Sequence, residues 1–205
     1  GITGISHFHE HMMFKGTYAM GIKPGTLQKD LEYDRQIDAL AAQIATEDAR
    51  IKGRDEAKVV EWKRQMSDLL NRQKAETIVS EEIWSAYQEA GGTGLNASTG
   101  SEMTQYYVTL PKNKIELYLA LEADRMANPV FREFYSERDV VFEERRMSVE
   151  STPLGKFDEE FNATFWNASP YKWPVVGWAS DIPTYTLQQA KDYFATYYAP
   201  NNLTG

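Results

Sequence analysis

Apolar positions recur along this chain in two periods, which predict mostly helices with one short stretch of strands. Between residues 27 and 77, apolar residues recur mostly every three or four positions, and the stretch has no proline and one glycine, Gly53. That period is typical of amphipathic helices, and a lone glycine in such a run marks a turn. We therefore predict a helical hairpin with its turn at Gly53.

The period changes to alternation after a run of glycines at positions 91–94. Apolar and polar residues alternate over 95–99 and again over 103–110, with a turn containing Gly100 between them, which predicts an antiparallel strand pair. The remaining segments have helical periodicity or helix-capping residues. We expect helices over 4–14, 80–90, 113–128, 134–150, 155–167 and 186–198, with the apolar positions of 113–128 deeply buried.

Composition fits a globular domain that buries a sizeable core. The chain has 205 residues, of which 42% are hydrophobic and 25% charged, with a formal charge of −8. No apolar run approaches the roughly 20 residues that a membrane helix needs. The negative charge argues against nucleic acid or anionic lipid as the main partner.

The chain has no cysteine, which excludes disulfides, thiolate nucleophiles and cysteine metal ligands. This composition fits an extracytoplasmic protein, such as a periplasmic or secreted one, without deciding the compartment. The first residues, from Gly1, have neither an initiator methionine nor a targeting pattern. We therefore expect the chain to be a fragment with upstream residues missing.

All three histidines lie in His7-Phe8-His9-Glu10-His11. In a helix, His7 and His11 are about 40° apart around the axis, so both imidazoles project from one face. Two imidazoles one turn apart are suited to binding zinc. The alternative is a chance meeting of surface or core histidines.

Glu10 completes the pattern His-x-x-Glu-His, which is the reverse of the His-Glu-x-x-His motif of zinc peptidases. At three positions after His7, its carboxylate can reach a metal-bound water and act as a general base. His9 points to the opposite side of such a helix, so we interpret it as a neighbour and not a ligand.

A third ligand is expected on the helix over 134–150. Glu137 and Glu144 are seven residues apart and share a stripe with Val141, whereas Glu143 lies on the face expected to be wet. A carboxylate on a buried stripe is costly unless it is paired or binds metal, which selects Glu144 as the ligand. The alternative is a carboxylate paired only with an arginine. Glu137 would orient a histidine or tune the metal water.

An aromatic segment bounded by prolines follows, with Tyr171, Trp173 and Trp178. These side chains are candidates for the lining of a cleft, with burial in the core as the alternative.

Several motifs in the same order resemble the pitrilysin and insulinase family of zinc peptidases, which includes the mitochondrial processing peptidases. They cover nearly the whole chain except the hairpin. The matching pieces are His7-Phe-His-Glu10-His11-Met-Met-Phe-Lys-Gly-Thr17, Leu95-Asn-Ala-Ser-Thr with Tyr106-Tyr107, Ala123-Asp-Arg-Met-Ala-Asn-Pro129, Glu137-Arg-Asp-Val-Val-Phe-Glu-Glu144, Pro170-Tyr, and Tyr197-Tyr-Ala-Pro-Asn-Asn202.

The resemblance implies one Zn²⁺ ion bound by His7, His11 and Glu144. It implies that Glu10 is the general base and that Glu137 is a supporting catalytic acid. The implied activity is an endopeptidase acting on peptides or small unfolded proteins. A substrate peptide would add as a strand along a substrate-binding segment, which is Asn96, Ala97 and Ser98.

The implied fold is α+β, with an antiparallel-rich sheet and helices packed on one face. Residues 1–205 would form one incomplete catalytic half-domain, completed by a second related half-domain or subunit. The family usually places its third ligand closer to the histidine motif, so we interpret 27–78 as an inserted helical hairpin. The alternative function is a non-catalytic scaffold or regulatory subunit of the same family.

Overall fold

The computed structural model describes residues Gly1–Gly205, which divide into two compact units. Unit 1 comprises Gly1–Lys15 and Ile83–Gly205, and unit 2 comprises Gly16–Glu82. The elements are, in chain order, α1 Ile5–Met12, α2 Leu27–Asp48, α3 Glu56–Glu76, α4 Glu82–Glu89, β1 Thr93–Thr99, β2 Thr104–Thr109, α5 Ile115–Ala127, α6 Phe134–Arg145, α7 Pro153–Phe165 and α8 Leu187–Tyr197. No helix has the length and apolar character needed to cross a membrane.

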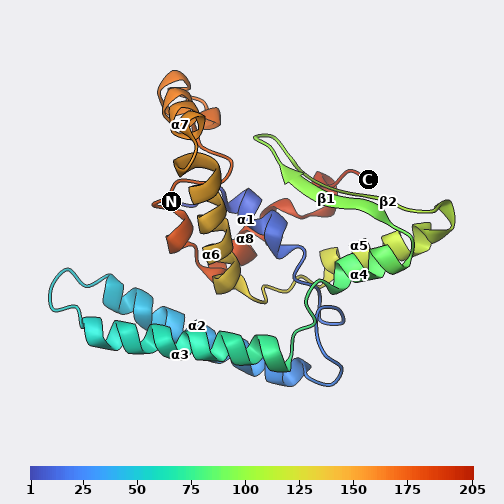
Figure 1. Ribbon diagram of the computed structural model, residues 1–205, viewed down its shortest axis with the longest axis horizontal. Coiled ribbons are helices and arrows are strands. Elements are labelled where there is room, and N and C mark those ends of the chain that lie inside the picture. Colours follow the sequence, from blue (N-terminus) through green and yellow to red (C-terminus); the bar gives the residue numbers. More distant parts are fainter. The chain divides into compact units, whose positions relative to one another are not determined.

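Unit 2 is the helical hairpin formed by α2 and α3, which lie side by side (Figure 1). Their shared seam buries Ile37 and Val59, among others. Asp55 caps α3 by accepting a hydrogen bond from the backbone N–H of Lys58 at 3.1 Å. The connection is longer than the turn predicted at Gly53: α2 already ends at Asp48, and Ile51 lies in the connection and is 97% exposed.

The two ends of the hairpin meet. Ile22 and Ile78 form an antiparallel bridge, and the backbone N–H of Lys23 donates to the carbonyl of Thr77 at 2.7 Å. The chain therefore enters and leaves the hairpin at one point.

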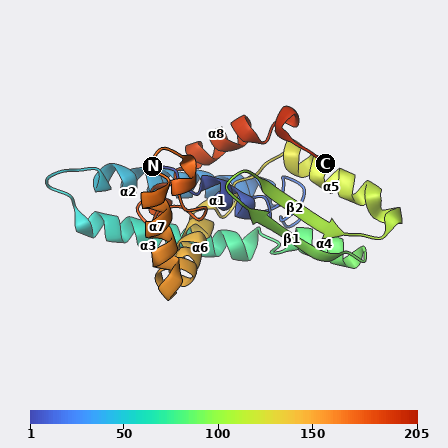
Figure 2. The same ribbon diagram turned by 90° about the horizontal axis from the view of Figure 1, so that it is seen from above.

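The sheet of unit 1 is smaller than the one predicted from the sequence. It has two antiparallel strands, with Ala97 opposite Tyr106 and Ser98 opposite Gln105. Helices α4 and α5 lie on one side of it (Figures 1 and 2). The antiparallel pair and its helical cover were predicted correctly, but an antiparallel-rich sheet was not, since the other elements of this chain are helical or irregular.

Helix α5 is less buried than predicted. Ile115 and Leu119 are more than half exposed, and the residue of this helix that is buried is Arg125. Its apolar positions include steps of two, which spread around a helix, so a single packing face cannot cover them all.

The core of unit 1 joins α1 to α6. Phe8 of α1 packs edge-to-face on Phe134 of α6, with ring centroids 5.0 Å apart, and Val141 is fully buried beside them. This packing faces the apolar side of α1 toward α6. It also sets the position of α1 along α6, so that His7 and His11 lie beside the last turn of α6.

Candidate metal centre

His7, His11 and Glu144 come together where α1 faces the last turn of α6. Nε2 of His7 lies 3.5 Å from Glu144 Oε1, and Nε2 of His11 lies 3.3 Å from Glu144 Oε2. One donor atom from each of the three residues lies within 4.8 Å of the others, and no other cluster of His, Asp and Glu in the chain has this arrangement. The three residues predicted as ligands therefore form one cluster.

Glu137 supports this cluster from one helical repeat earlier on α6. Nδ1 of His11 lies 2.8 Å from Glu137 Oε1, and Lys15 Nζ lies 2.5 Å from Glu137 Oε2. Burial alone raises the pKa of Glu137, but the contacts with His11 and Lys15 outweigh it and lower the pKa. The carboxylate therefore holds Nδ1 of His11 and leaves Nε2 facing Glu144.

The two carboxylates also change the proton affinity of His11. Burial alone lowers the pKa of its imidazole, but the contacts with the carboxylates of Glu137 and Glu144 raise the pKa to about 9. The same contacts with His11 and His7 hold the pKa of the Glu144 carboxyl well below its ordinary range. Without a metal, the cluster therefore favours a protonated histidine beside an ionised glutamate.

Glu144 was predicted as a ligand because it was expected on the buried side of its helix, and that expectation was wrong. The Glu144 side chain is 44% exposed, while Glu137 and Val141 on the same side of α6 are buried. Glu144 lies only about 20° around the helix from Glu137, so the difference in exposure comes from what packs beside each turn of α6. Glu144 consequently faces a cleft, where a carboxylate stays partly solvated.

His9 lies on the far side of α1 from the metal cluster, as predicted. It is 1% exposed and packs among the rings of Phe131, Tyr193, Phe194 and Tyr198. Burial lowers the pKa of its imidazole to about 3, so the ring is neutral there. Neither of its ring nitrogens has a hydrogen-bond partner.

Glu10 lies beside the cluster and lines the same cleft. The residue is 8% exposed, and its carboxylate accepts a hydrogen bond from the hydroxyl of Thr99 on β1. Thr99 is in turn hydrogen-bonded to Thr104 on β2, at 3.0 Å between the hydroxyl oxygens. The strand pair thus holds the carboxylate of Glu10 at the edge of the cleft.

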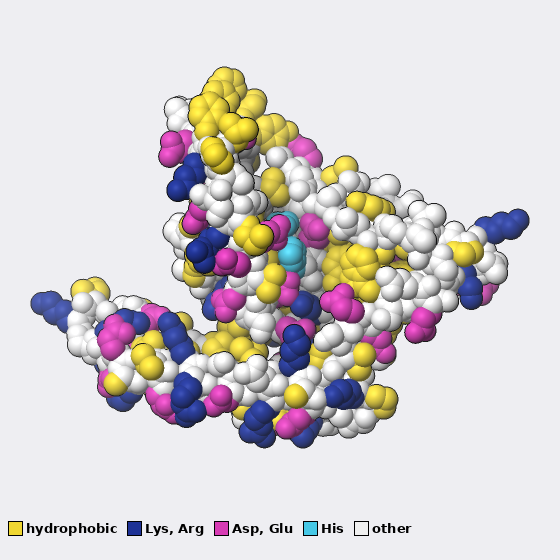
Figure 3. Space-filling view, viewed as in Figure 1, with side chains coloured by type: hydrophobic (Ala, Val, Ile, Leu, Met, Phe, Trp, Pro, Cys, Tyr) yellow, Lys and Arg dark blue, Asp and Glu magenta, His cyan; other side chains and the backbone are white.

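The cleft has a volume of about 970 Å³. Figure 3 shows the histidine side chains within this hollow. One wall is the end of β1, with Ala97 and Ser98, and the other runs from α7 to Val176. Of the predicted substrate segment, Asn96 does not line the cleft; its side-chain oxygen accepts the backbone N–H of Ala97 at 2.9 Å.

Aromatic side chains form part of the second wall. Tyr171 and Trp173 line the cleft together with Trp166, whereas Trp178 does not. The Tyr171 hydroxyl donates to Glu102 at the turn between β1 and β2. Of the three aromatic residues considered as cleft-lining from the sequence, Tyr171 and Trp173 therefore line the cleft and Trp178 does not.

The contacts of Lys15, Thr99 and Arg145 around this cluster were not predicted from the sequence. Lys15 lies beyond the end of α1, and the turn that follows Met12 brings its ammonium to Glu137. Thr99 and Arg145 carried no sequence signal, since their partners Glu10 and Glu159 are brought to them by tertiary packing.

Comparison with known proteins gives the family. The sequence pattern of the insulinase family (peptidase family M16) matches residues 68–177, which is more than half of the chain. The chain belongs to the insulinase family of peptidases. The match covers Glu137 and Glu144 and begins after the histidine motif.

The chain is also similar to curated zinc proteases. The chain is 31% identical over 139 residues to the zinc protease PqqE of Helicobacter pylori, covering 67% of this chain and 31% of that protein. It is 28% identical over 152 residues to an uncharacterized zinc protease of Mycobacterium leprae, covering 73% of this chain and 34% of the relative. The chain thus spans about a third of the length of these relatives.

The fold is shared with a solved protease structure. The crystal structure of a protease from Helicobacter pylori superposes with a TM-score of 0.67 at 23% identity, covering 98% of this chain and 36% of that protein. Almost the whole chain therefore has the fold of part of that protease, including residues outside the family match.

The residues of the cluster fit zinc, the metal named in these relatives. Ligands about 2.0–2.1 Å from a tetrahedral zinc ion are about 3.3 Å from one another. The two separations between Glu144 oxygens and histidine nitrogens, 3.3 and 3.5 Å, are close to that spacing. They exceed the ~2.7–2.9 Å typical of a charge-assisted hydrogen bond. Two imidazoles and a carboxylate also form a donor set that zinc accepts.

Proposed function

We propose that this chain is the catalytic half-domain of a zinc-dependent endopeptidase that hydrolyses peptides or small unfolded proteins. His7, His11 and Glu144 would hold one zinc ion. The observation that carries the proposal is the spacing of their donor atoms at the side of a cleft that also contains Glu10. The zinc protease relatives support the same reading.

Zinc held by these residues would act as a Lewis acid and favour ionisation of water near neutral pH. Glu10 would be the general base, taking a proton from water as the oxygen adds to the peptide carbonyl. It would then return that proton to the leaving amine as the C–N bond breaks. The Thr99 hydroxyl, which donates to Glu10, would hold the carboxylate in place for both transfers.

The substrate would lie along β1 as an added strand, with its backbone paired to the segment Asn96, Ala97 and Ser98. Ala97 and Ser98 line the cleft, which supports this placement. In the free chain, the side-chain oxygen of Asn96 accepts the hydrogen bond from the backbone N–H of Ala97. A substrate carbonyl would replace that side chain and pair with the same N–H.

Glu137 would be the supporting acid that keeps His11 oriented for metal binding. A second related half-domain or subunit would complete the chamber around the substrate. We therefore expect the 205-residue chain to bind zinc but to cleave peptides slowly by itself, with cleavage restored when the related half-domain is added. Rapid cleavage by the isolated chain would contradict this dependence.

The test of the mechanism is Glu10→Gln, which keeps the side chain's shape and removes its basicity. We expect unchanged zinc content and a loss of hydrolysis of about 10²-fold or more, measured with a fluorogenic peptide and the completed enzyme. Glu143→Gln, at an exposed position of α6, is the matched control. Loss of zinc in Glu10→Gln would assign Glu10 a ligand role and contradict the mechanism. Zinc binding without hydrolysis in the unaltered, completed protein would favour the scaffold alternative.

A further inference from the structure

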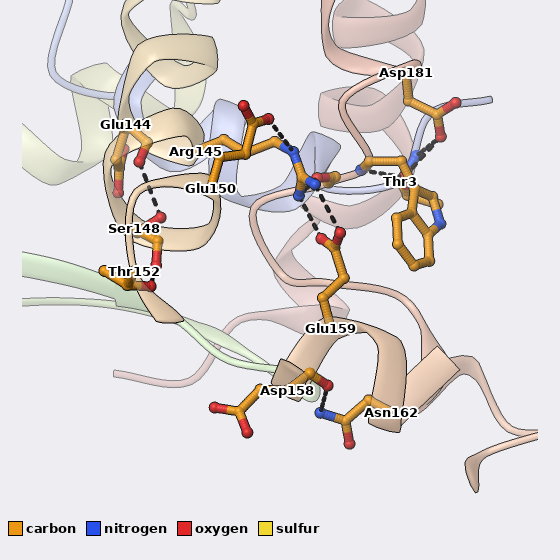
Figure 4. Close-up of polar contacts among 12 residues, drawn as sticks. Thr3, Glu144, Arg145, Ser148, Glu150, Thr152, Asp158, Glu159, Asn162 and Asp181 are labelled. Atoms are coloured by element: carbon orange, nitrogen blue, oxygen red, sulfur yellow. Dashed lines mark hydrogen bonds and ion pairs between the residues drawn. The ribbon is translucent and has the colours of Figure 1, made fainter. Parts of the chain in front are cut away.

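Arg145 is a buried cation immediately after Glu144. Its side chain is 4% exposed and forms a two-pronged pair with Glu159 of α7. Nη1 donates to one Glu159 oxygen at 2.6 Å, and Nη2 donates to the other at 2.8 Å. Figure 4 shows the guanidinium between Glu159 and the more distant Glu150. This pair joins the helix that carries Glu144 to one wall of the cleft.

The same guanidinium also reaches the segment that holds the beginning of α1. Nη1 donates to the carbonyl of Gly177 at 2.8 Å. The next residue, Trp178, donates its backbone N–H to the Thr3 hydroxyl at 3.0 Å, and Tyr185 donates its hydroxyl to the Thr3 carbonyl. Arg145 is therefore connected through Gly177 and Thr3 to the start of the helix that carries His7 and His11.

Glu144 depends on such support, because it lies where the regular helix ends. α6 ends at Arg145 and continues as a π-helical turn over Arg146–Glu150. The Glu144 carboxylate has contacts with His7 and His11 but with no side chain that would fix it against the scaffold. Its position relative to the histidines is set by where the end of α6 is held.

We propose that Arg145 is a positioning residue that sets the separation between Glu144 and the two histidines, and so the affinity and geometry of the metal site. This inference rests on the proposed zinc function. A buried ion pair is often no more stabilising than apolar side chains of equal volume, so fold stability alone does not require it. The forked geometry of an arginine–carboxylate pair instead adds directional constraint, and here it constrains three segments at once.

The experiment compares Arg145→Lys and Glu159→Gln with Arg146→Lys. Arg145→Lys keeps the charge but cannot hold Glu159 and Gly177 together with a planar fork. Glu159→Gln removes the charge of the partner at nearly constant size. Arg146 is the neighbouring arginine, pairs with Glu143 at 2.8 Å, and is exposed, so its substitution is the matched control.

Two readouts are measured on the 205-residue chain: the dissociation constant for zinc, and the visible absorption spectrum of the Co²⁺-substituted chain, which reports ligand geometry. We expect about tenfold weaker zinc binding and an altered Co²⁺ spectrum in Arg145→Lys and Glu159→Gln, an effect of the size seen when residues supporting metal ligands are changed. Arg146→Lys should match the unaltered chain in both.

Circular dichroism establishes that each variant is folded. If Arg145→Lys does not fold, Glu159→Gln alone decides the question. A folded variant of either kind with unchanged zinc affinity and an unchanged Co²⁺ spectrum would overturn the positioning role. If the unaltered chain and Arg146→Lys also bound no zinc, the proposed zinc function would be contradicted. The positioning role of Arg145, which rests on that function, would then be contradicted as well.

Discussion

Nδ1 of His11 lies 2.8 Å from a carboxylate oxygen of Glu137, and this contact determines which nitrogen of the ring faces the cleft. With Nδ1 held as a donor, Nε2 is the nitrogen left for a metal. Glu137 was selected from the sequence because it precedes Glu144 by seven residues. The structure adds that it is also held by Lys15.

Glu137→Gln tests the support that this carboxylate gives to His11. An amide can donate as well as accept and carries no charge, so it fixes the ring orientation less strongly. We expect the dissociation constant for zinc to rise about tenfold, measured by competition with a chromophoric chelator. Glu143→Gln on the same helix is the control. Equal zinc affinity in the two variants would contradict the supporting role.

Zinc affinity is expected to depend on pH through His11. The pKa of its imidazole is raised to about 9 in the metal-free chain, so the ring is mostly protonated at pH 7 and must lose a proton to bind metal. Affinity should therefore increase as the pH rises from 6 toward 9 and then level off with respect to His11. Calorimetry in buffers of different ionisation enthalpy measures the proton released. Binding without proton release at pH 7 would contradict the raised pKa.

Thr99→Val tests the hydrogen bond to Glu10. The substitution keeps the branched shape and removes the hydroxyl that donates to the carboxylate. A hydrogen bond to a charged group contributes about 1.5 kcal/mol or more, so we expect kcat to fall about tenfold with zinc content unchanged. Thr109→Val, at an exposed position of β2, is the control. A kcat equal to that of the control would remove Thr99 from the mechanism.

Gly4→Ala tests the close approach at the start of α1. Gly4 has a positive φ of 79°, and an added Cβ would overlap the backbone of Gly177. Gly25 has a φ of 76° but open space around it, so Gly25→Ala isolates the cost of the conformation. We expect Gly25→Ala to cost about 1–2 kcal/mol of unfolding free energy, and Gly4→Ala to cost about 1–3 kcal/mol more because of the overlap. Equal denaturant midpoints for Gly4→Ala and Gly25→Ala would show that Gly4 and Gly177 are not in tight contact.

Much of the secondary structure, and the placement of His7 and His11 on one face of a helix, was predictable from periodicity and spacing, whereas Glu144 was supported by the family resemblance. The helix expected over 186–198 begins with a capping box formed by Thr186 and Gln189, and α1, α2 and α3 lie within the predicted ranges. These features are local, because a helix period and a cap depend on residues a few positions apart.

What the sequence did not reveal depends on contacts between distant segments. The partial exposure of Glu144 follows from the cleft beside α6, which a helical wheel does not represent. The pair between Arg145 and Glu159 requires α7 to fold back toward α6. The exposure of Ile115 on α5 similarly depends on which neighbours cover that helix. Each is decided by tertiary packing.

The bridge between Ile22 and Ile78 has a consequence for the entropy of folding. The cost of closing a loop grows with the logarithm of its length, and α1 and α4 are separated by the whole of unit 2 along the chain. Once the hairpin has formed, its ends are already joined, so the hairpin itself adds almost no length to the segment that must be closed between α1 and α6. Lengthening or shortening the turn around Gly53 then leaves the closure cost of the metal cluster almost unchanged.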